Sequence, residues 1–521
     1  MAVVLKDGWV TRFGLIMAMA GNAVGLGNFL RFPGKAAPYG GAFMVPYFIT
    51  LLLVGIPIMW MEWTIGRHGG AYGHGTTPGM FHRMWRHPVS KYLGVFGVLI
   101  PAMVGVYYIY IESWSLGYAW ETMTGAYWGK TSNSEMKSVF AGYLGMNGGA
   151  LSFSAKAYFF FLITFALNII VFSLGISKGI EVVAKYCMPT LVVLGVVLAV
   201  RVLTLPPVEG RGIGDGLALI WRVDDWTVLL KPDIWLSAAG QIFFTLSVGL
   251  GMIHSYASYL KKHEDVTLSG LTACGMNELV EVIIGGTIAI PAAVLFFGVA
   301  QTQEIAQGGT FSIGFYALPV IFQQMHGGQF FGTLWFLLLF LAGLTSSMAM
   351  FTPLLLFLED ELQVRRRRAV FFIAVTVFLF MQPVVFFMHH GVVDELDYWM
   401  GEMALVLFVA IESVVFCWIF GVERGWREMH QGADLQIPRV FFHVMKYVTP
   451  VFVLVIVGWW FSNSFLDKLM MKGVDAADRP YLWLARCMML SMALFLIWGI
   501  RRAWRTHPRY FDEEGNEEER P

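Results

Sequence analysis

Residues 21–33, with the sequence GNAVGLGNFLRFP, place three glycines and two asparagines inside an otherwise apolar stretch. Glycine disfavours a helix interior, and a helix that unwinds frees carbonyl oxygens for a hard cation and N–H groups for an anion. In lipid, unwound backbone is tolerated only where it is buried in protein or lines a cavity. The stretch therefore predicts a broken membrane helix around a small polar site, and such a site indicates transport.

A second interrupted stretch, FFTLSVGLG, lies at residues 243–251. It combines two hydroxyl side chains with two glycines, so it also offers free backbone groups and oxygen ligands. The two stretches fall in the first and sixth apolar runs, which hold the same position in two consecutive groups of five. Interrupted helices at matching positions are a strong sequence indication of a transporter site. Because each group has an odd number of spans, the second group crosses the membrane in the opposite sense, so the repeat is inverted.

The composition is that of an integral membrane protein. Of the 521 residues, 57% are hydrophobic and 14% charged, with a mean hydropathy of +0.62, whereas soluble domains carry about 25% charged residues. The formal net charge is zero, and we expect membrane lipid and no nucleic acid as partners. The cysteines show no metal-ligand or disulfide spacing, which predicts free thiols in or beside apolar spans at Cys187, Cys274, Cys417 and Cys487.

Apolar runs bounded by charged residues, glycine or proline predict an all-α membrane protein with twelve transmembrane helices. The helices are expected at roughly 11–38, 41–69, 89–124, 157–175, 178–204, 233–261, 268–298, 330–362, 368–389, 394–421, 439–462 and 480–503. The chain then divides into an N-terminus at 1–10, a first five-helix repeat at 11–204, an extracellular loop at 205–232, a second, inverted five-helix repeat at 233–421, helices eleven and twelve at 422–503, and an acidic tail at 504–521.

Lysine and arginine set the expected orientation. They gather before helix one, between helices two and three, and around 365–368, which all fall on one side of the membrane. The opposite loop at 299–329 has no lysine or arginine. Both termini are therefore expected in the cytoplasm, with the protein in the plasma (inner) membrane of a prokaryote.

Six motifs, in order along the chain, resemble the neurotransmitter:sodium symporter family, especially its bacterial leucine-transporting branch. They are GNAVGLGNFLRFP at 21–33, GRHGGAYGHGTTP at 66–78, YYIYIESW at 107–114, GQIFFTLSVGLG at 240–251, NELVEVIIGG at 277–286 and AGLTSS at 342–347. The resemblance implies broken helices one and six, and a sodium-coupled secondary active symporter that works by alternating access. It implies a transporter and no enzyme.

The resemblance also implies two sodium sites. The first would use Ala23, Asn28, Thr245 and Asn277, with the substrate carboxylate completing the shell. The second would use Gly21, Val24, Ala342, Thr345 and Ser346. From spacing alone, hydrogen bonding between helices explains such Asn, Thr and Ser residues equally well; the motif set favours sodium.

For the substrate, the resemblance implies that amides of Leu26 and Gly27 and the Tyr108 hydroxyl hold a carboxylate. Position 23 is alanine, where amine-carrying members of the family have aspartate, so an amino acid is expected and a monoamine is not. The full expected set is Asn22, Ala23, Leu26, Gly27, Val104, Tyr108, Phe244, Thr245, Ser247, Leu250, Ser346 and Met350.

Two positions in this set depart from the leucine-transporting branch. Leu250 stands for a phenylalanine and Met350 for an isoleucine, which removes a rigid ring and adds a flexible thioether. A roomier cavity would admit methionine, phenylalanine or tryptophan as well as aliphatic substrates. The alternative is that both are neutral core substitutions.

Charged and bulky residues around the site are expected to act as gates. The resemblance assigns the outer gate to Arg31, Asp397, Gln241, Tyr108 and Phe244, and the inner gate to Lys6, Trp9, Ser258, Tyr259 and Asp360. Arg31 is expected to meet Asp397 through water; the alternative is a snorkelling anchor at the interface. Lysine stands at position 6 where the family has arginine, so the inner gate would be weaker, or Arg12 would share its role.

Glu281 stands where chloride-dependent members carry a small hydroxyl residue. Its carboxylate can supply the negative charge, so chloride is expected to be unnecessary, and an acid within an apolar span could also carry a proton outward. Two other intramembrane acids, Glu62 and Glu112, are expected to bridge helices by hydrogen bonds.

Rival interpretations are weaker on context. The GIGD string at 212–215 lies in a polar loop, and residues 125–131 are one residue short of a phosphate-binding loop. An ion channel or a transporter-like amino-acid sensor stays as an alternative. The preferred amino acid and the oligomeric state are left open by the sequence, a homodimer included.

Overall fold

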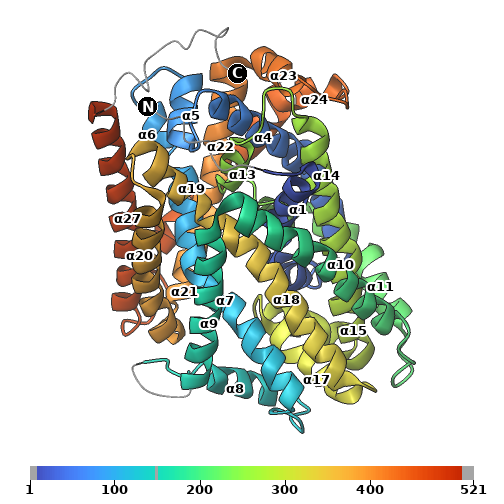
Figure 1. Cartoon of the computed structure of the whole chain (residues 1–521). Helices are drawn as coiled ribbons and strands as arrows, with labels where there is room; N and C mark the ends of the chain where they lie inside the picture. The colour runs from blue at the N-terminus through green and yellow to red at the C-terminus, as the bar shows by residue number, and fades with distance from the viewer. Residues whose placement is uncertain (1–8, 147–150, 507–521) are drawn as a thin grey trace.

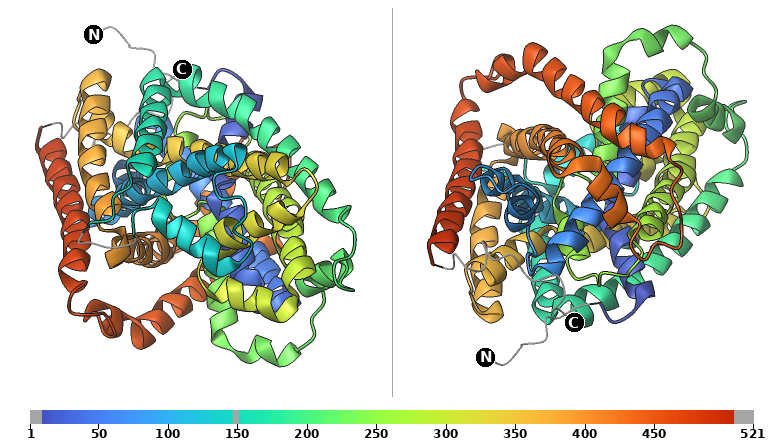
Figure 2. Two further views of the ribbon diagram at one scale, coloured as in Figure 1. Left: turned by 90° about the horizontal axis from the view of Figure 1, so that it is seen from below. Right: turned by 90° about the horizontal axis from the view of Figure 1, so that it is seen from above.

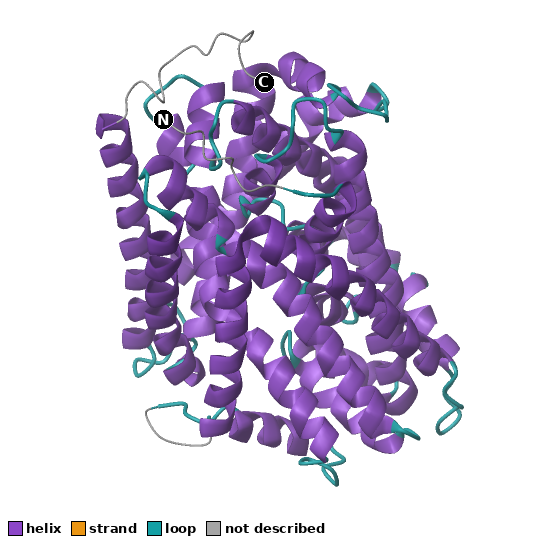
Figure 3. Ribbon diagram, viewed as in Figure 1, coloured by secondary structure: helices purple, strands orange, loops and turns teal. Residues whose placement is uncertain are grey.

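The computed structural model describes residues 9–146 and 151–506. In these ranges the regular structure is helical, with one isolated backbone bridge between Val208 and Arg211. Loops gather at the two ends of the molecule (Figure 3). This is the arrangement that a bilayer imposes, because a helix satisfies its backbone hydrogen bonds within its own segment.

The first five predicted spans are each built from one or more helical segments. They are α1 Arg12–Ala23, η1 Gly27–Arg31 and α2 Phe32–Ala36; η2 Gly40–Phe43, α3 Met44–Thr50, η3 Leu51–Gly55 and α4 Ile56–Ala71; α6 Ser90–Leu93 and α7 Phe96–Thr124; α9 Ala155–Gly175; and η4 Ile176–Ile180 with α10 Glu181–Leu203.

The second five spans follow the same plan. They are α12 Pro232–Thr245 and α13 Met252–Ala257; α14 Val266–Glu278, η6 Leu279–Gly285 and α15 Gly286–Phe297; α18 Gly328–Met350, α19 Thr352–Leu356 and η8 Phe357–Glu361; α20 Arg366–Phe386; and α21 Val392–Leu396, η10 Asp397–Ala404, α22 Leu405–Val414 and η11 Val415–Gly421. The last two spans are α24 Val440–His443, η12 Val444–Val448 and α25 Thr449–Asn463, and α27 Arg479–Thr506.

The expected all-α membrane fold is confirmed. Among the described residues, nine continuous helices are long and apolar enough to cross a membrane, and the first span becomes a tenth as a pair of helices bent by 42°. One of the nine, Ala155–Leu203, is 49 residues long and contains the fourth and fifth predicted spans, between which Gly175 has a φ of 90°. The sixth span escapes a length criterion because α12 and α13 are each short.

Both predicted interruptions are present. α1 ends at Ala23, and Val24 is extended before the helix resumes at Gly27. Between α12 and α13, Gly249 and Gly251 have φ of 76° and 72°, and Ser247 adopts 57° without being glycine. Left-handed backbone at three positions within five residues explains why this helix cannot continue.

The burial of the helices separates an inner bundle from a lipid-facing rim. In the apolar window of Ser90–Thr124, 94% of residues are buried, against 28% for Val440–Asn463 and 39% for Arg479–Thr506. The last two spans accordingly lie at the edge of the bundle in both end views (Figure 2). The polar site therefore has to be sought among the first ten spans.

Several helices that the sequence analysis did not separate cover the two ends. α5 Thr77–Met84, α6, α23 Val422–Met429 and α24 lie at one end, and α8 Asn133–Tyr143 and α17 Leu318–Gln324 at the other (Figure 1). The remaining segments are α11 Ile213–Trp221, η5 Trp226–Leu230, α16 Val299–Gln307, η7 Ile313–Ala317, η9 Met388–His390 and α26 Phe465–Leu469.

Asp265 fixes the start of α14 outside the membrane-spanning segment. Its carboxylate accepts from the amides of Thr267 (2.8 Å), Leu268 (3.0 Å) and Asp434 (2.8 Å). Burial alone would raise the pKa of Asp265, but these donors lower it below its ordinary value.

We expect Asp265→Ala to lower the free energy of unfolding by about 1–2 kcal/mol, because it removes a helix cap. A depressed pKa means that this stability is present above the unfolded-state value of about 4 and is lost as pH falls through the folded-state value. The difference between variant and wild type, measured by denaturant unfolding in detergent, should therefore shrink in acid. Asp225→Ala is the matched control, since Asp225 makes the same turn with Thr227 on an exposed loop; an equal loss in both variants would contradict the assignment.

Candidate functional site

A small cavity lies between the two interrupted helices. It is lined by Asn22, Ala23, Gly25, Gly27, Asn28, Val104, Tyr108, Phe244, Thr245, Ser247, Leu250, Ser346 and Met350. The structure thus brings together every residue that the sequence analysis expected to contact the substrate except Leu26. Leu26 lies on the outer side, where its amide donates to the Tyr108 hydroxyl at 3.0 Å.

Side-chain hydroxyls hold the two interruptions against each other. Ser247 Oγ donates to the carbonyl of Asn22 at 2.8 Å. A Cβ added at Gly25 would lie 2.7 Å from both Ser346 Oγ and Tyr108 Oη. An alanine at this position would force both side chains to shift, and the sequence did not indicate these contacts.

One group of oxygens, from the residues expected at the second sodium site, lies where α1 meets α18. Ser346 Oγ lies 3.0 Å from the carbonyl of Gly21 and 3.2 Å from that of Val24. Thr345 Oγ1 lies 3.1 Å from the carbonyl of Ala342. These are the five residues expected at the second sodium site, and they supply the neutral oxygens that a monovalent hard cation requires.

A second polar group joins η1, α12 and α14 to η6. Asn28 Nδ2 donates to Asn277 Oδ1 at 2.7 Å and to Glu281 Oε2 at 2.9 Å, while Asn28 Oδ1 accepts from the Gly25 amide. Thr245 Oγ1 donates to the carbonyl of Gln241 at 2.9 Å. Ala23 lines the cavity beside them. The residues expected at the first sodium site are therefore neighbours.

Glu281 is the hub of that second group. Besides Asn28, it accepts from the Tyr47 hydroxyl and from Gln241 Nε2, each at 3.0 Å. Glu278, which the sequence analysis missed, accepts from the same Tyr47 hydroxyl at 2.9 Å and from Asn277 at 3.2 Å. The spacing of three between these acids on one helix could have indicated that they share partners.

Two direct contacts of the outer-gate residues were not part of the expectation. The direct partner of Arg31 is Glu402, at 2.8 Å, and the Arg31 side chain is 8% exposed, so it is no snorkelling anchor. Its guanidinium lies 4.6 Å from the centre of the Phe244 ring. Asp397 and Arg31 both line a second cavity that adjoins the substrate cavity on its outer side, and Asp397 accepts from the Tyr107 hydroxyl at 2.7 Å.

Gln241 is the second difference. It was expected beside the outer gate, but its amide donates to Glu281 and approaches the Gly27 carbonyl at 3.5 Å. The sequence of α12 alone does not show whether the Gln241 side chain faces the outer gate or η6.

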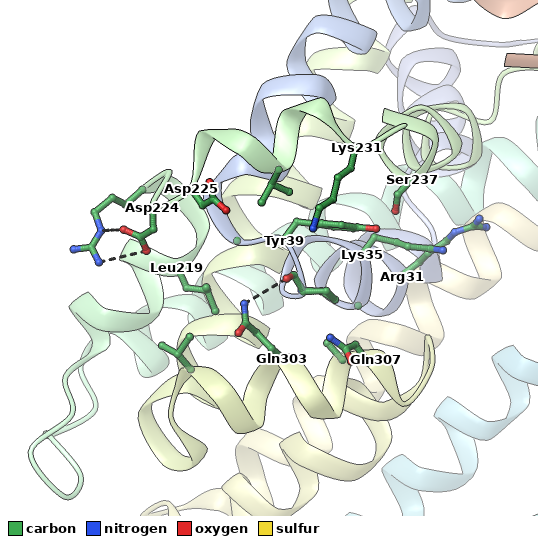
Figure 4. A pocket seen from close by; sticks show the side chains of 18 of the residues that line it. Arg31, Lys35, Tyr39, Leu219, Asp224, Asp225, Lys231, Ser237, Gln303 and Gln307 are labelled. Atoms are coloured by element: carbon green, nitrogen blue, oxygen red, sulfur yellow. Dashed lines mark hydrogen bonds and ion pairs between the residues drawn. The ribbon is translucent and has the colours of Figure 1, made fainter. Parts of the chain in front are cut away.

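Outside the gate the molecule has a larger polar cavity of about 790 Å³. Arg31, Lys35 and Lys231 line it together with Asp224 and Asp225. In Figure 4, Gln303 and Gln307 lie across the cavity from Lys231 and Ser237. Charges of both signs at the entrance suit a zwitterion or water more than an apolar ligand.

Three hydrogen bonds of the expected inner-gate residues lie on the inner side of the cavity. Trp9 Nε1 donates to the carbonyl of Tyr256 at 3.2 Å, and Ser258 Oγ donates to that of Ser255 at 2.7 Å. Asp360 accepts from the Gly75 amide at 3.1 Å. Of the other inner-gate residues, Tyr259 is half-buried, and Lys6 lies outside the described residues.

Arg12, the alternative inner-gate cation, lies 3.8 Å from Asp434. Both side chains are largely exposed, so this ion pair contributes little to closure.

Glu62 and Glu112 do bridge helices by hydrogen bonds. Glu62 accepts from the Gly249 amide, and Glu112 accepts from Asn168 at 3.2 Å.

The sequence and the structure both match known proteins. A model of the sodium:neurotransmitter symporter family matches residues 6–143 and 144–500. A sodium-dependent transporter of Methanocaldococcus jannaschii is 26% identical over 475 residues, covering 89% of this chain and 92% of its own. The sodium-dependent serotonin transporter of Drosophila melanogaster is 27% identical, covering 87% and 76%. The crystal structure of MhsT in complex with L-phenylalanine superposes with a TM-score of 0.73 at 26% identity, covering 87% of this chain and 99% of MhsT.

We expect Gly25→Ala to raise the sodium concentration needed for half-maximal thermal stabilisation at least tenfold, because the added Cβ displaces Tyr108 and Ser346. Gly34→Ala is the control on the same broken helix, since its Cβ would meet its nearest atom, Thr310 Cα, at 3.8 Å. The measurement is the melting temperature in detergent across a sodium titration at constant ionic strength. Equal sodium responses in the two variants would refute the close contact.

Proposed function

The chain belongs to the sodium:neurotransmitter symporter family, and from that premise we propose that it carries neutral apolar amino acids, aliphatic to aromatic, across the membrane with sodium. Its relatives are sodium-dependent transporters, so it is an integral membrane protein that uses sodium to move a small molecule. The observation that carries the proposal is the cavity between the two interrupted helices, which combines backbone polar groups with an apolar wall.

The chemistry of the cavity supports a zwitterion with an apolar side chain. The residues that line it include no aspartate, glutamate, lysine or arginine. A substrate that carries its own two charges can use the amides near Gly27 for its carboxylate and free carbonyls for its ammonium. Val104, Leu250 and Met350 would then face the side chain, and an ionised side chain would be left unpaired there.

The breadth of the substrate range rests on two of these residues. Leu250 is smaller than the ring found in the leucine-transporting branch, and Met350 can change its rotamer to fit different shapes. Methyl-sized differences in an apolar cavity are worth about 1–3 kcal/mol. We therefore propose competition among leucine, methionine and aromatic amino acids. MhsT, solved with L-phenylalanine, is consistent with this range.

Two sodium ions fit the two oxygen groups. In the group of Gly21, Val24, Ala342, Thr345 and Ser346 all the oxygens are neutral. Ser346 Oγ lies 3.0 Å and 3.2 Å from the carbonyls of Gly21 and Val24, and Thr345 Oγ1 lies 3.1 Å from the carbonyl of Ala342. The group of Ala23, Asn28, Thr245 and Asn277 lies on the cavity side, where a substrate carboxylate would complete the shell. A shared carboxylate of this kind couples substrate binding to sodium binding.

Glu281 supports chloride independence, because its carboxylate lies among Asn28, Tyr47 and Gln241. There it supplies a negative charge beside the residues expected at the first sodium site. We further propose that this acid provides a route for proton antiport. Sodium-driven uptake that an imposed proton gradient leaves unchanged would contradict that route.

Alternating access is the mechanism that the gates support. The cavity is closed outside by Tyr108, Phe244 and the Arg31–Glu402 pair, and inside by the contacts of Trp9 with Tyr256 and of Asp360 with Gly75. A channel needs a continuous pore instead. We place the end with α5, α6, α23 and α24 in the cytoplasm of a prokaryotic cell, since these segments and their loops are rich in arginine and lysine.

The first test is calorimetric or scintillation-proximity binding of an amino-acid panel to purified protein in sodium and in potassium. We expect binding of leucine, methionine and aromatic amino acids in sodium only. Asn28→Ala should weaken sodium and substrate binding together by about tenfold or more, which corresponds to a loss of about 1.4 kcal/mol in the free energy of binding. Asn168→Ala is the matched control, because Asn168 is equally buried and also contacts a carboxylate, that of Glu112. Unchanged substrate affinity in Asn28→Ala would rule out the shared carboxylate.

The second test concerns chloride. Wild-type binding should be the same when gluconate replaces chloride, whereas Glu281→Ser should bind substrate several-fold more weakly in gluconate than in chloride, because it lacks the fixed charge. The readout is sodium-dependent amino-acid binding in matched salts. A wild-type protein that needs chloride would overturn the assignment of Glu281.

A further inference from the structure

A cluster of titratable side chains lies on the cytoplasmic side of the substrate cavity, outside both sodium groups. Glu62 of α4, His254 of α13 and Glu412 of α22 are all fully buried, and one ligand atom from each lies within 4.8 Å of the other two. His254 Nδ1 is 3.6 Å from a Glu62 oxygen, and Nε2 is 3.5 Å from a Glu412 oxygen. We call these three residues the buried triad.

The polar atoms of the buried triad are mostly unsatisfied. Both ring nitrogens of His254, both oxygens of Glu412 and Oε2 of Glu62 have no hydrogen-bond partner in the described part of the chain. Buried polar groups are hydrogen-bonded in the large majority of cases, and two adjacent carboxylates in a dry site cannot both be ionised without a cation. The unsatisfied atoms therefore indicate that the buried triad binds a proton or a cation that the three side chains do not supply themselves.

The geometry favours a proton over a metal ion. A metal requires one lone pair from the ring and all ligands directed at a common centre. Here each ring nitrogen faces a different carboxylate, so the imidazole stands between two acceptors. That is the arrangement in which protons are shared along a short relay.

Other groups near the buried triad do not compete for that role. Phe408 of α22 packs its ring 6.1 Å from the His254 ring and adds only apolar surface. Cys417 of η11 is directed at Met61 Sδ, 3.9 Å away, one turn from the cluster. Across α4, α13 and α22, the titratable groups that face one another are the triad itself.

The buried triad also contacts the interrupted segment that forms the substrate cavity. Oε1 of Glu62 accepts from the amide of Gly249, which lies between Ser247 and Gly251 in left-handed backbone. The next residue, Leu250, lines the cavity. An amide donor favours the ionised carboxylate, so the conformation that closes the cavity also favours loss of a proton from Glu62.

We propose that Glu62, His254 and Glu412 form a proton-binding site that is linked through Gly249 to the substrate cavity. Closing the cavity around substrate releases a proton from the triad to water, and a proton bound there disfavours closure. Linkage is reciprocal, so acid weakens substrate binding and substrate binding releases protons. This inference rests on the proposed function and adds to it a site separate from Glu281.

The test uses the purified full chain and two readouts. Sodium-dependent binding of radiolabelled leucine is measured from pH 5.5 to 8.5, and proton release on leucine addition is followed with a pH dye in weak buffer. In wild type, affinity should fall about tenfold from the alkaline to the acid end, with protons released. His254→Gln keeps a polar side chain that does not titrate, so it should bind at pH 8.5, flatten the profile to within threefold and abolish proton release.

Glu112→Gln is the matched control, because it removes another buried intramembrane acid that does not face the triad; it should keep the wild-type profile. Glu412→Gln serves where His254→Gln does not fold, and should flatten the profile as well. A wild-type profile in both triad variants would overturn the proposal, as would pH-independent wild-type binding. Inhibition by Zn²⁺ that His254→Gln removes, with no proton release in wild type, would overturn it in favour of a metal site.

A failure of the proposed function is distinguishable from a failure of the triad. If no amino acid binds in sodium, protonation is followed directly by infrared difference spectra of the carboxyl groups across the same pH range. A protonated carboxyl band that is lost in Glu412→Gln and kept in Glu112→Gln would support the proton site, and its persistence in Glu412→Gln would overturn it.

Discussion

Backbone hydrogen bonding in a dry environment is the constraint on which the rest of the structure depends. A membrane helix can be interrupted only if each freed amide and carbonyl finds a partner inside the protein. Here the partners are single side chains from other helices. Tyr108 accepts from the Leu26 amide, Ser247 donates to the Asn22 carbonyl, and Glu62 accepts from the Gly249 amide. The site is thus made of the same contacts that allow the helices to be broken.

These contacts explain why a few residues belong to the interrupted segments, the cavity and the Arg31 ion pair at once. Ser346 contacts two carbonyls of the first interruption and also lines the substrate cavity. Phe244 closes the cavity and supports the Arg31 guanidinium. Because the Arg31 side chain is only 8% exposed and that of Glu402 is 34% exposed, their attraction is screened less than that of a fully exposed pair. The closed state therefore depends on contacts that no single helix can make by itself.

The fold and the cavity were largely predictable, and particular contacts were not. Apolar length and glycine content located the twelve spans and both interruptions, since these follow from bilayer thickness and backbone propensity. The direct contact of Glu402 with Arg31 was not predicted, because it depends on how the π-helical turns in η10 rotate side chains. The sequence did not indicate a role for His254 or Glu412, because a single polar residue in an apolar run can have many structural roles. The short helices α8 and α11 were missed because loops carry no long apolar run.

The left-handed backbone conformation of Ser247 is strained, whereas a glycine would adopt it without strain. Its φ of 57° is stabilised by two hydrogen bonds: its amide donates to the carbonyl of Phe244, and its hydroxyl donates to the carbonyl of Asn22, which belongs to the other broken helix. Such left-handed backbone costs about 1–2 kcal/mol for a residue with a Cβ. The strain at Ser247 is therefore offset against the hydrogen bond to Asn22, so this contact between the two broken helices is easier to open than the same bond made from an unstrained residue.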